Sequence, residues 1–224
     1  MDLVYICRDG DNEELKYSIR SAVANLPHDN IWVVGGKPDW YTGKYLAAPQ
    51  TGSKDVNIKN NMLFAISSPE VSESFILMND DFFIIKEIDH VENYYDGYLH
   101  NKANKLLNDQ RGNPYADKVN KTFLYLAKLL KTTNILNYDT HVPMIVEKEK
   151  LFNVLKHPGL PRSIYGNLYA IGGKQLKDVK FFKTDNDIDI NDLIYVSTED
   201  NGFNLLYEKV LKDMFPYPSQ YECP

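Results

Sequence analysis

The chain has 224 residues, of which 43% are apolar and 25% charged, and its formal net charge at pH 7 is −6. This composition excludes disordered and coiled-coil proteins, and the length suits one domain. The acidic balance disfavours a broad basic surface for nucleic acid or anionic membrane. Cys7 and Cys223 lack metal-binding spacing, and no apolar run approaches a membrane span of ~18 residues, so we expect a cytoplasmic protein.

The N-terminal third predicts strand, helix and strand. An apolar run at residues 3–7 ends in Arg-Asp-Gly, and apolar positions at helical spacing follow over residues 13–26. Asp11 or Asn12 is the expected N-cap of this helix, and a second apolar run covers residues 31–36. Two strands joined by such a helix form a βαβ unit, whose strand ends meet at the ligand-binding edge of a parallel sheet.

The alternation continues along the chain. Residues 37–51 are rich in Gly, Pro and Tyr and predict a loop, whereas residues 89–114 lack periodicity and predict an insertion or lid. The other expected elements are helices at 56–68, 115–134, 148–157 and 203–214 and strands at 74–78, 82–85, 138–146 and 193–198. Together they predict an α/β fold with a central, mainly parallel sheet flanked by helices, in one domain covering residues 1–224.

The triplet Asn79-Asp80-Asp81 separates two apolar runs. A buried charge is costly unless it is paired or holds a metal. One interpretation is a hairpin turn that is open to water. The other is a divalent cation, Mg²⁺ or Mn²⁺, held by Asp80 and Asp81 against the diphosphate of a donor, as nucleotide-sugar transferases of the GT-A type require.

Charged residues near the first strand are candidates for donor binding. At the strand end, Asp9 can accept hydrogen bonds from a base or ribose and Arg8 can pair with phosphate, although a simple turn explains both. Arg20 and Lys59 lie in predicted helices and can pair with phosphate, although such charges are commonly solvated or structural.

Four residues in the second half are candidates for catalysis. His141, flanked by Asp139, can act as a general base on an acceptor hydroxyl or hold donor phosphate, although a lone His is usually structural. Arg162 can stabilise charge on a diphosphate. Asp200 lies in a predicted turn and can supply a third carboxylate to the metal or a base to the acceptor.

Two blocks of the sequence resemble the Stealth family of sugar-phosphate transferases. DLVYICRDGDNEELKYSIRS (residues 2–21) is similar to the family's opening, and SESFILMNDDFFI (residues 72–84) is similar to its Asn-Asp-Asp block. Shorter similarities follow at residues 141–143, at Arg162 with Asn167, and at residues 199–201. The chain departs from the family pattern at Cys7 and Arg8, where the family has Trp-Val, and only echoes its next helix start at residues 57–60.

The resemblance implies a GT-A-like, Rossmann-type domain that moves a glycosyl or sugar-1-phosphate group from a nucleotide-sugar donor to a hydroxyl of a polysaccharide or glycan. It implies a donor and metal half at about residues 1–88 and an acceptor half at about 89–224, with the insertion at 89–114. It also adds Asn57 and Asn79 to the expected donor contacts, and it makes Asp81 the more direct metal ligand of the two aspartates.

Three other functions remain open from the sequence. The first is a nucleotide-sugar-binding module without turnover, and the second is a nucleotidyltransferase, for which we find no Gly-rich, Lys-containing loop near the first strand. The third is a glycosyltransferase acting on a modified DNA base, whose basic groove would come from Lys102, Lys105, Arg111, Lys118 and Lys121. The sequence makes no prediction of the oligomeric state.

Overall fold

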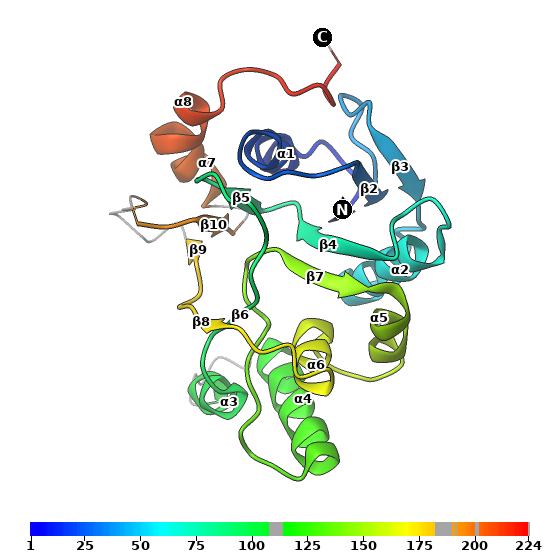
Figure 1. Cartoon of the computed structure of the whole chain (residues 1–224), viewed down its shortest axis with the longest axis vertical. Helices are drawn as coiled ribbons and strands as arrows, with labels where there is room; N and C mark the ends of the chain where they lie inside the picture. The colour runs from blue at the N-terminus through cyan, green and yellow to red at the C-terminus, as the bar shows by residue number, and fades with distance from the viewer. Residues whose placement is uncertain (108–113, 182–189, 191, 200–201, 224) are drawn as a thin grey trace. The chain divides into compact units, whose positions relative to one another are not determined.

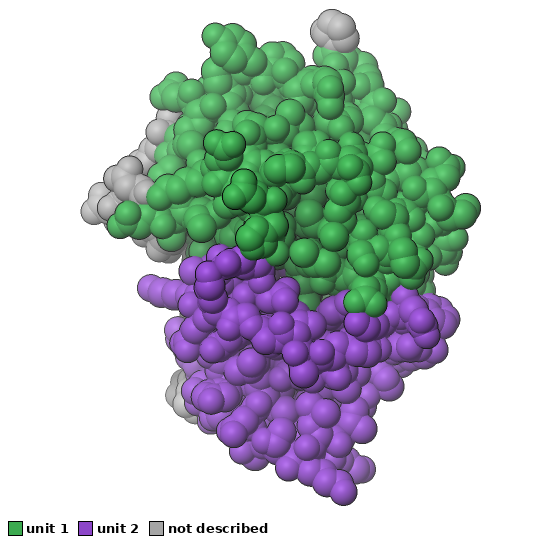
Figure 2. Space-filling view, viewed as in Figure 1, with its two compact units in different colours: residues 1–91, 141–148, 179–224 green, residues 92–140, 149–178 purple. Residues whose placement is uncertain are grey.

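Figure 1 shows the computed structural model of the chain, which describes residues 1–107, 114–181, 190, 192–199 and 202–223. The chain divides into two compact units, which are coloured separately in Figure 2. The first unit comprises Met1–Val91, His141–Lys148 and Val179–Pro224, and the second comprises Glu92–Thr140 and Glu149–Asp178. The division into two compact units does not show what either unit binds. The single domain with a donor half and an acceptor half therefore stays a prediction.

A five-stranded sheet forms the centre of the first unit, in the order β3-β2-β1-β4-β7. Its strands are β1 (Asp2–Cys7), β2 (Ile31–Gly35), β3 (Lys44–Ala47), β4 (Ser74–Asn79) and β7 (Met144–Glu147). β1 pairs in parallel with β2 and β4, β2 pairs in parallel with β3, and only β7 is antiparallel to its neighbour. The predicted α/β fold with a mainly parallel central sheet is therefore confirmed.

Burial explains why the apolar runs form the middle of this sheet. Every residue of β1 and β2 is buried, as expected for parallel strands covered on both faces. Helix α2 (Lys54–Ser67) packs on β1 and β2, and helix α1 (Glu13–Asn25) packs on β5 (Phe82–Ile84). Of the two expected caps, Asn12 is the one found, because its side chain accepts a hydrogen bond from Leu15 N at 3.0 Å.

A second sheet of the first unit joins distant parts of the chain. β10 (Tyr195–Thr198) lies between β5, to which it is antiparallel, and β9 (Lys180–Phe181), to which it is parallel. The predicted C-terminal helix instead consists of α7 (Phe203–Leu206), a π-helical turn η1 (Tyr207–Leu211) and α8 (Lys212–Met214). Buried Phe203, Leu206 and Leu211 from these segments share a core with Phe83 and Val196. This core fixes β10 beside β5.

The C-terminal segment crosses the first unit beyond α8. In Figure 1 it is the red chain that passes over α1 and reaches the loop before β3. Backbone hydrogen bonds fasten it there, from Thr42 N to Tyr221 O at 2.9 Å and from Cys223 N to Trp40 O at 2.7 Å. Because Glu222 of this segment also pairs with Arg20 on α1, the segment ties α1 to the edge of the central sheet.

The second unit is mainly helical. Its elements are β6 (Tyr94–Tyr95), α3 (Leu99–Leu107), α4 (Pro114–Leu130), α5 (Lys148–Leu155, whose first residue belongs to the first unit), α6 (Pro161–Leu168) and β8 (Lys174–Gln175). α4 packs against α3 and α6, and β6 pairs in parallel with β8. Among the described residues of both units, no helix is long and apolar enough to cross a membrane.

Three sequence predictions are corrected by these elements. The predicted loop 37–51 contains β3, a short edge strand whose residues are exposed or half-buried and so lack the apolar signal of a central strand. The predicted aperiodic segment 89–114 contains β6 and α3. The predicted strand 138–146 is shortened to β7, since Pro143 has no N–H to donate to a sheet and stands immediately before Met144.

Candidate active site

A polar cavity of about 420 Å³ lies in the first unit, where β1 and β4 end. Ligands of open α/β folds bind at this carboxyl edge of the sheet. Six of the residues singled out in the sequence line the cavity, namely Arg8, Asn57, Asn79, Asp80, Asp81 and His141. The structure therefore brings residues from four separate parts of the chain to one site.

The cavity also contains polar side chains that the sequence analysis missed. They are Glu14, Gln50, Lys54, Asn61 and Lys180. Amides, carboxylates and cations thus face one space, which suits a ligand that carries both phosphate and several hydroxyl groups. Gln50 stands in the predicted loop and Lys180 in an unpredicted strand, so neither carried a signal of a site.

A close approach between β2 and α2 shapes one side of the cavity. Gly35 has a φ of 114°, and a Cβ atom added there would lie 2.2 Å from Cys7 O and 2.3 Å from Asn61 Nδ2. Without a side chain at Gly35, Asn61 donates a hydrogen bond to Cys7 O at 3.0 Å and accepts one from Gln50 Nε2 at 2.7 Å. These two amide side chains hold the carboxyl end of β1 in place beside the cavity.

Asp80 is linked to the first helix through its cap. Asn12 Nδ2 donates a hydrogen bond to Asp80 Oδ2 at 2.7 Å, while Asn12 Oδ1 caps α1. Burial, and then the charge of Asp81, raise the pKa of Asp80 to about 6, against the lowering effects of Asn12 and Arg8. The Asp80 carboxyl is therefore protonated more easily than that of an exposed aspartate.

Asp81 has one oxygen with partners and one without. Lys180 Nζ and Ser197 Oγ each lie 3.2 Å from Asp81 Oδ2, and both donate to it. Asp81 Oδ1 is buried and accepts no hydrogen bond from any residue in the described part of the chain. A buried carboxylate oxygen of this kind calls for a ligand such as a cation or a donor group.

Asp80 and Asp81 supply part of the ligand set that a hard divalent cation needs. Mg²⁺ is commonly bound in proteins through one or two carboxylates together with substrate phosphates. Asp80 and Asp81 supply two carboxylates, and Oδ1 of Asp81 is available to a ligand. No group of three or more His, Cys, Asp or Glu side chains that could hold a metal occurs within the described ranges. Any ion here would therefore need ligands from the donor or from water.

His141 faces the cavity just before β7. Its ring contacts Phe82 edge to face, with 6.2 Å between the ring centroids. Nearby, burial and the charge of Asp80 raise the pKa of the Cys7 thiol to about 12. The thiol is thus protonated at neutral pH and unsuited to be a nucleophile.

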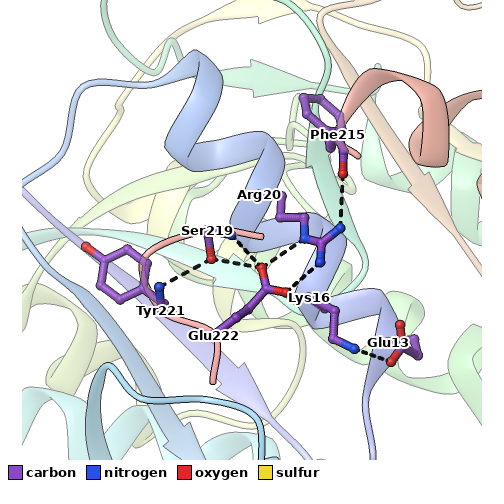
Figure 3. Close-up of polar contacts among 7 residues, drawn as sticks. All are labelled: Glu13, Lys16, Arg20, Phe215, Ser219, Tyr221 and Glu222. Atoms are coloured by element: carbon purple, nitrogen blue, oxygen red, sulfur yellow. Dashed lines mark hydrogen bonds and ion pairs between the residues drawn. The ribbon is translucent and has the colours of Figure 1, made fainter. Parts of the chain in front are cut away.

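Three predicted donor ligands do not line this cavity, although they belong to the first unit. Asp9 is exposed directly after β1, and Lys59 is exposed on α2. Arg20 makes an ion pair with Glu222, shown in Figure 3, in which its Nη2 lies 2.6 Å from Glu222 Oε2. Its Nη1 also donates to Phe215 O at 3.1 Å. Donor binding by these three residues stays a prediction.

Three predicted catalytic residues lie elsewhere in the chain. Asp139 and Arg162 belong to the second unit, where Asp139 Oδ2 accepts a hydrogen bond from the Tyr115 hydroxyl at 2.6 Å and Arg162 is buried on α6. Asp200 lies outside the described residues. Their roles in catalysis also stay predictions.

Comparisons with known proteins yield only distant similarity. No family model and no curated protein sequence matches the chain. Among solved structures, an active-site mutant of LgtC has a TM-score of 0.48 and 12% identity, covering 88% of this chain and 87% of that one. The glycosyltransferase GlyE of Streptococcus pneumoniae TIGR4 has TM-scores of 0.38 and 0.41 and 11% identity in two structures.

This chain spans 65% and 66% of the two GlyE chains, with 99% and 98% of its own residues aligned. TM-scores below 0.5 at identities near a tenth support neither a fold nor a function for this chain. Membership of the Stealth family likewise stays a prediction.

Proposed function

We propose that the chain is a transferase that binds a nucleotide-activated sugar and passes a glycosyl or sugar-1-phosphate group to a hydroxyl of a glycan or polysaccharide. The observation that carries this proposal is the position of Asp80 and Asp81 at the carboxyl edge of the sheet, facing a polar cavity with an unpartnered carboxylate oxygen. A binding module without turnover would have no need of an acid–base group such as His141, which lines the same cavity.

We further propose that Asp80 and Asp81 hold Mg²⁺ or Mn²⁺. When bound, such a cation neutralises the charge that develops on the leaving phosphate. Arg8 is suited to pair with the donor's phosphates, and Asn57 and Asn79 can donate hydrogen bonds to its hydroxyl or phosphate oxygens. These side chains line the same cavity as the two carboxylates, which supports a shared ligand.

We propose that His141 removes the proton from the acceptor hydroxyl. An imidazole can take up a proton near neutral pH, and His141 lines the cavity from the side of β7. Asp139, Arg162 and Asp200 are the further candidates for acceptor binding or charge stabilisation. A modified DNA base as acceptor is the less supported alternative, given the net charge of −6.

Thermal unfolding with a panel of nucleotide sugars, each with and without Mn²⁺, tests the proposal. A ligand present at 100 times its Kd stabilises the folded state by about 2.7 kcal/mol, equivalent to a Tm rise of roughly 5–11 °C for a protein of this size. We expect at least one nucleotide sugar to produce such a rise in the presence of Mn²⁺. The absence of any rise, with nucleotide sugars and with free nucleotides, would contradict it.

A further inference from the structure

Lys180 is a cation built into the carboxylate site. Its Nζ lies 3.2 Å from Asp81 Oδ2, and the two side chains are only 21% and 13% exposed. A lysine on a solvated surface would not be held in this way. Lys180 therefore neutralises Asp81 in the absence of any other cation.

The strand pairing fixes this contact. In the second sheet, Ser197 of β10 stands opposite Phe82 of β5 on one side and opposite Lys180 of β9 on the other. Asp81 immediately precedes β5, so the side chains of Ser197 and Lys180 both reach the same oxygen, Oδ2. Ser197 is fully buried, which holds the arrangement in place.

A divalent ion and the Lys180 ammonium would compete for the same carboxylate. Asp81 carries a single negative charge, and cations close to each other in a site with little water repel strongly. An ion bound by Asp80 and Asp81 therefore weakens the pairing of Lys180 with Asp81. Released from Asp81, the ammonium would still face the cavity, because Lys180 also lines it.

We propose that Lys180 is the counter-ion of Asp81 in the metal-free protein and is displaced into the cavity when a divalent cation binds. This inference rests on the metal site of the proposed function. It adds a role for a residue without any sequence signal: Lys180 balances the charge of Asp81 without metal and becomes available to the donor's phosphates once metal is bound.

Calorimetric titration with Mn²⁺ alone, without donor, tests the displacement. We expect Lys180→Gln to bind Mn²⁺ about 10-fold more tightly than the wild type, equivalent to ~1.4 kcal/mol, because the ion no longer displaces an ammonium. Lys180→Arg keeps the positive charge and should retain an affinity near that of the wild type. Lys54→Gln is the matched control, because Lys54 lines the cavity but makes no ion pair with Asp81 among the described contacts.

Thermal unfolding provides a second readout that does not depend on activity. Lys180→Gln should lower the Tm of the protein in a chelator, and saturating Mn²⁺ should abolish the difference from the wild type, because the lost ion pair exists only without metal. A merely structural lysine would instead lower the Tm equally with and without Mn²⁺.

Several results would overturn the inference. One is an unchanged or weaker Mn²⁺ affinity in Lys180→Gln. Another is an equal gain in Mn²⁺ affinity in Lys54→Gln, which would indicate a general charge effect. A third is the absence of Mn²⁺ binding in all variants. The proposed transferase function fails by a different result, namely no nucleotide-sugar binding to a protein that binds Mn²⁺ normally. The two failures are thus distinguishable.

Discussion

The ion pair between Arg20 and Glu222 predicts a large loss of stability when Glu222 is changed to Gln (Figure 3). Arg20 donates two charge-assisted hydrogen bonds to this carboxylate, Nε to Oε1 at 2.8 Å and Nη2 to Oε2 at 2.6 Å. The side chains are only 10% and 5% exposed, so water replaces little of what is lost. Ser219 N and Oγ also donate to Oε1, at 2.8 and 3.0 Å.

The size of the stability loss depends on which of these hydrogen bonds the Gln side chain can still make. Breaking a buried ion pair by removing one partner costs about 3–5 kcal/mol, because the remaining charge is left uncompensated. The Gln carbonyl can still accept from Ser219 and from one Arg20 nitrogen, and Arg20 keeps its bond to Phe215 O. We therefore expect a cost of about 3 kcal/mol, at the lower end of that range, which corresponds to a Tm decrease of roughly 6–12 °C.

Thermal unfolding of the wild type, Glu222→Gln and a control variant measures this cost. Glu13→Gln is the matched control, because Glu13 pairs with Lys16 on the same helix α1 but is 51% exposed. An exposed pair contributes at most about 1 kcal/mol, so this variant should lose no more than ~4 °C. Equal Tm changes in the two variants would refute the view that burial makes the Arg20 pair strong.

The pH dependence of the same variant has a definite sign. Burial alone would raise the pKa of Glu222, but hydrogen bonds from Arg20 and Ser219 outweigh it and lower the pKa below the usual 4.5. The carboxylate therefore contributes stability above pH 4.5 that is lost as pH falls through the lowered value. The Tm difference between wild type and Glu222→Gln should be constant from about pH 6 to 8 and shrink at acid pH. A difference that grows towards acid pH would contradict this assignment.

Three further predictions concern the proposed site. Asp81→Asn should leave the protein folded and retain less than about a tenth of the turnover, a barrier increase above ~1.4 kcal/mol, and greater residual activity would remove Asp81 from catalysis. Asp9→Ala should raise the nucleotide Kd more than it lowers kcat at saturation, and an unchanged Kd in a binding titration would exclude Asp9 from donor binding. If His141 is the base, His141→Gln should lower kcat at saturating donor more than it weakens donor binding; a variant that loses only donor affinity would show that His141 merely holds phosphate.

Much of the first unit could be predicted because its elements carry strong local signals. The buried runs that form β1, β2 and β4 are nearly all apolar, and Asn12 stands where a helix cap is expected. Helix α6 was missed because it contains Gly166, a residue of low helix propensity. Gly166 is required by packing, since a Cβ atom there would lie 2.2 Å from the Tyr138 ring. Such a contact has no signature in the local sequence.

The candidate site was predictable where its residues carry a local signal in the sequence. Asp80 and Asp81 interrupt an apolar stretch, and that interruption identified them. Lys180 and Ser197 reach Asp81 only through the pairing of β9 with β10, and β9 has two residues, too few for a periodic pattern. Arg20 illustrates the same limit, because its partner in the structure, Glu222, lies 202 residues away and no local pattern indicates that pairing.

The central claim is that the cavity beside Asp80 and Asp81 transfers a group from a nucleotide sugar. Incubation of the protein and Mn²⁺ with isotope-labelled nucleotide sugars, followed by separation of the nucleotide products, tests it most directly, because slow transfer to water reports turnover even without the natural acceptor. We predict release of a nucleoside diphosphate if a glycosyl group moves, or of a nucleoside monophosphate if a sugar phosphate moves, with either product strongly reduced in Asp81→Asn. Nucleotide sugars that bind but remain intact, or product that forms equally in Asp81→Asn, would contradict the claim.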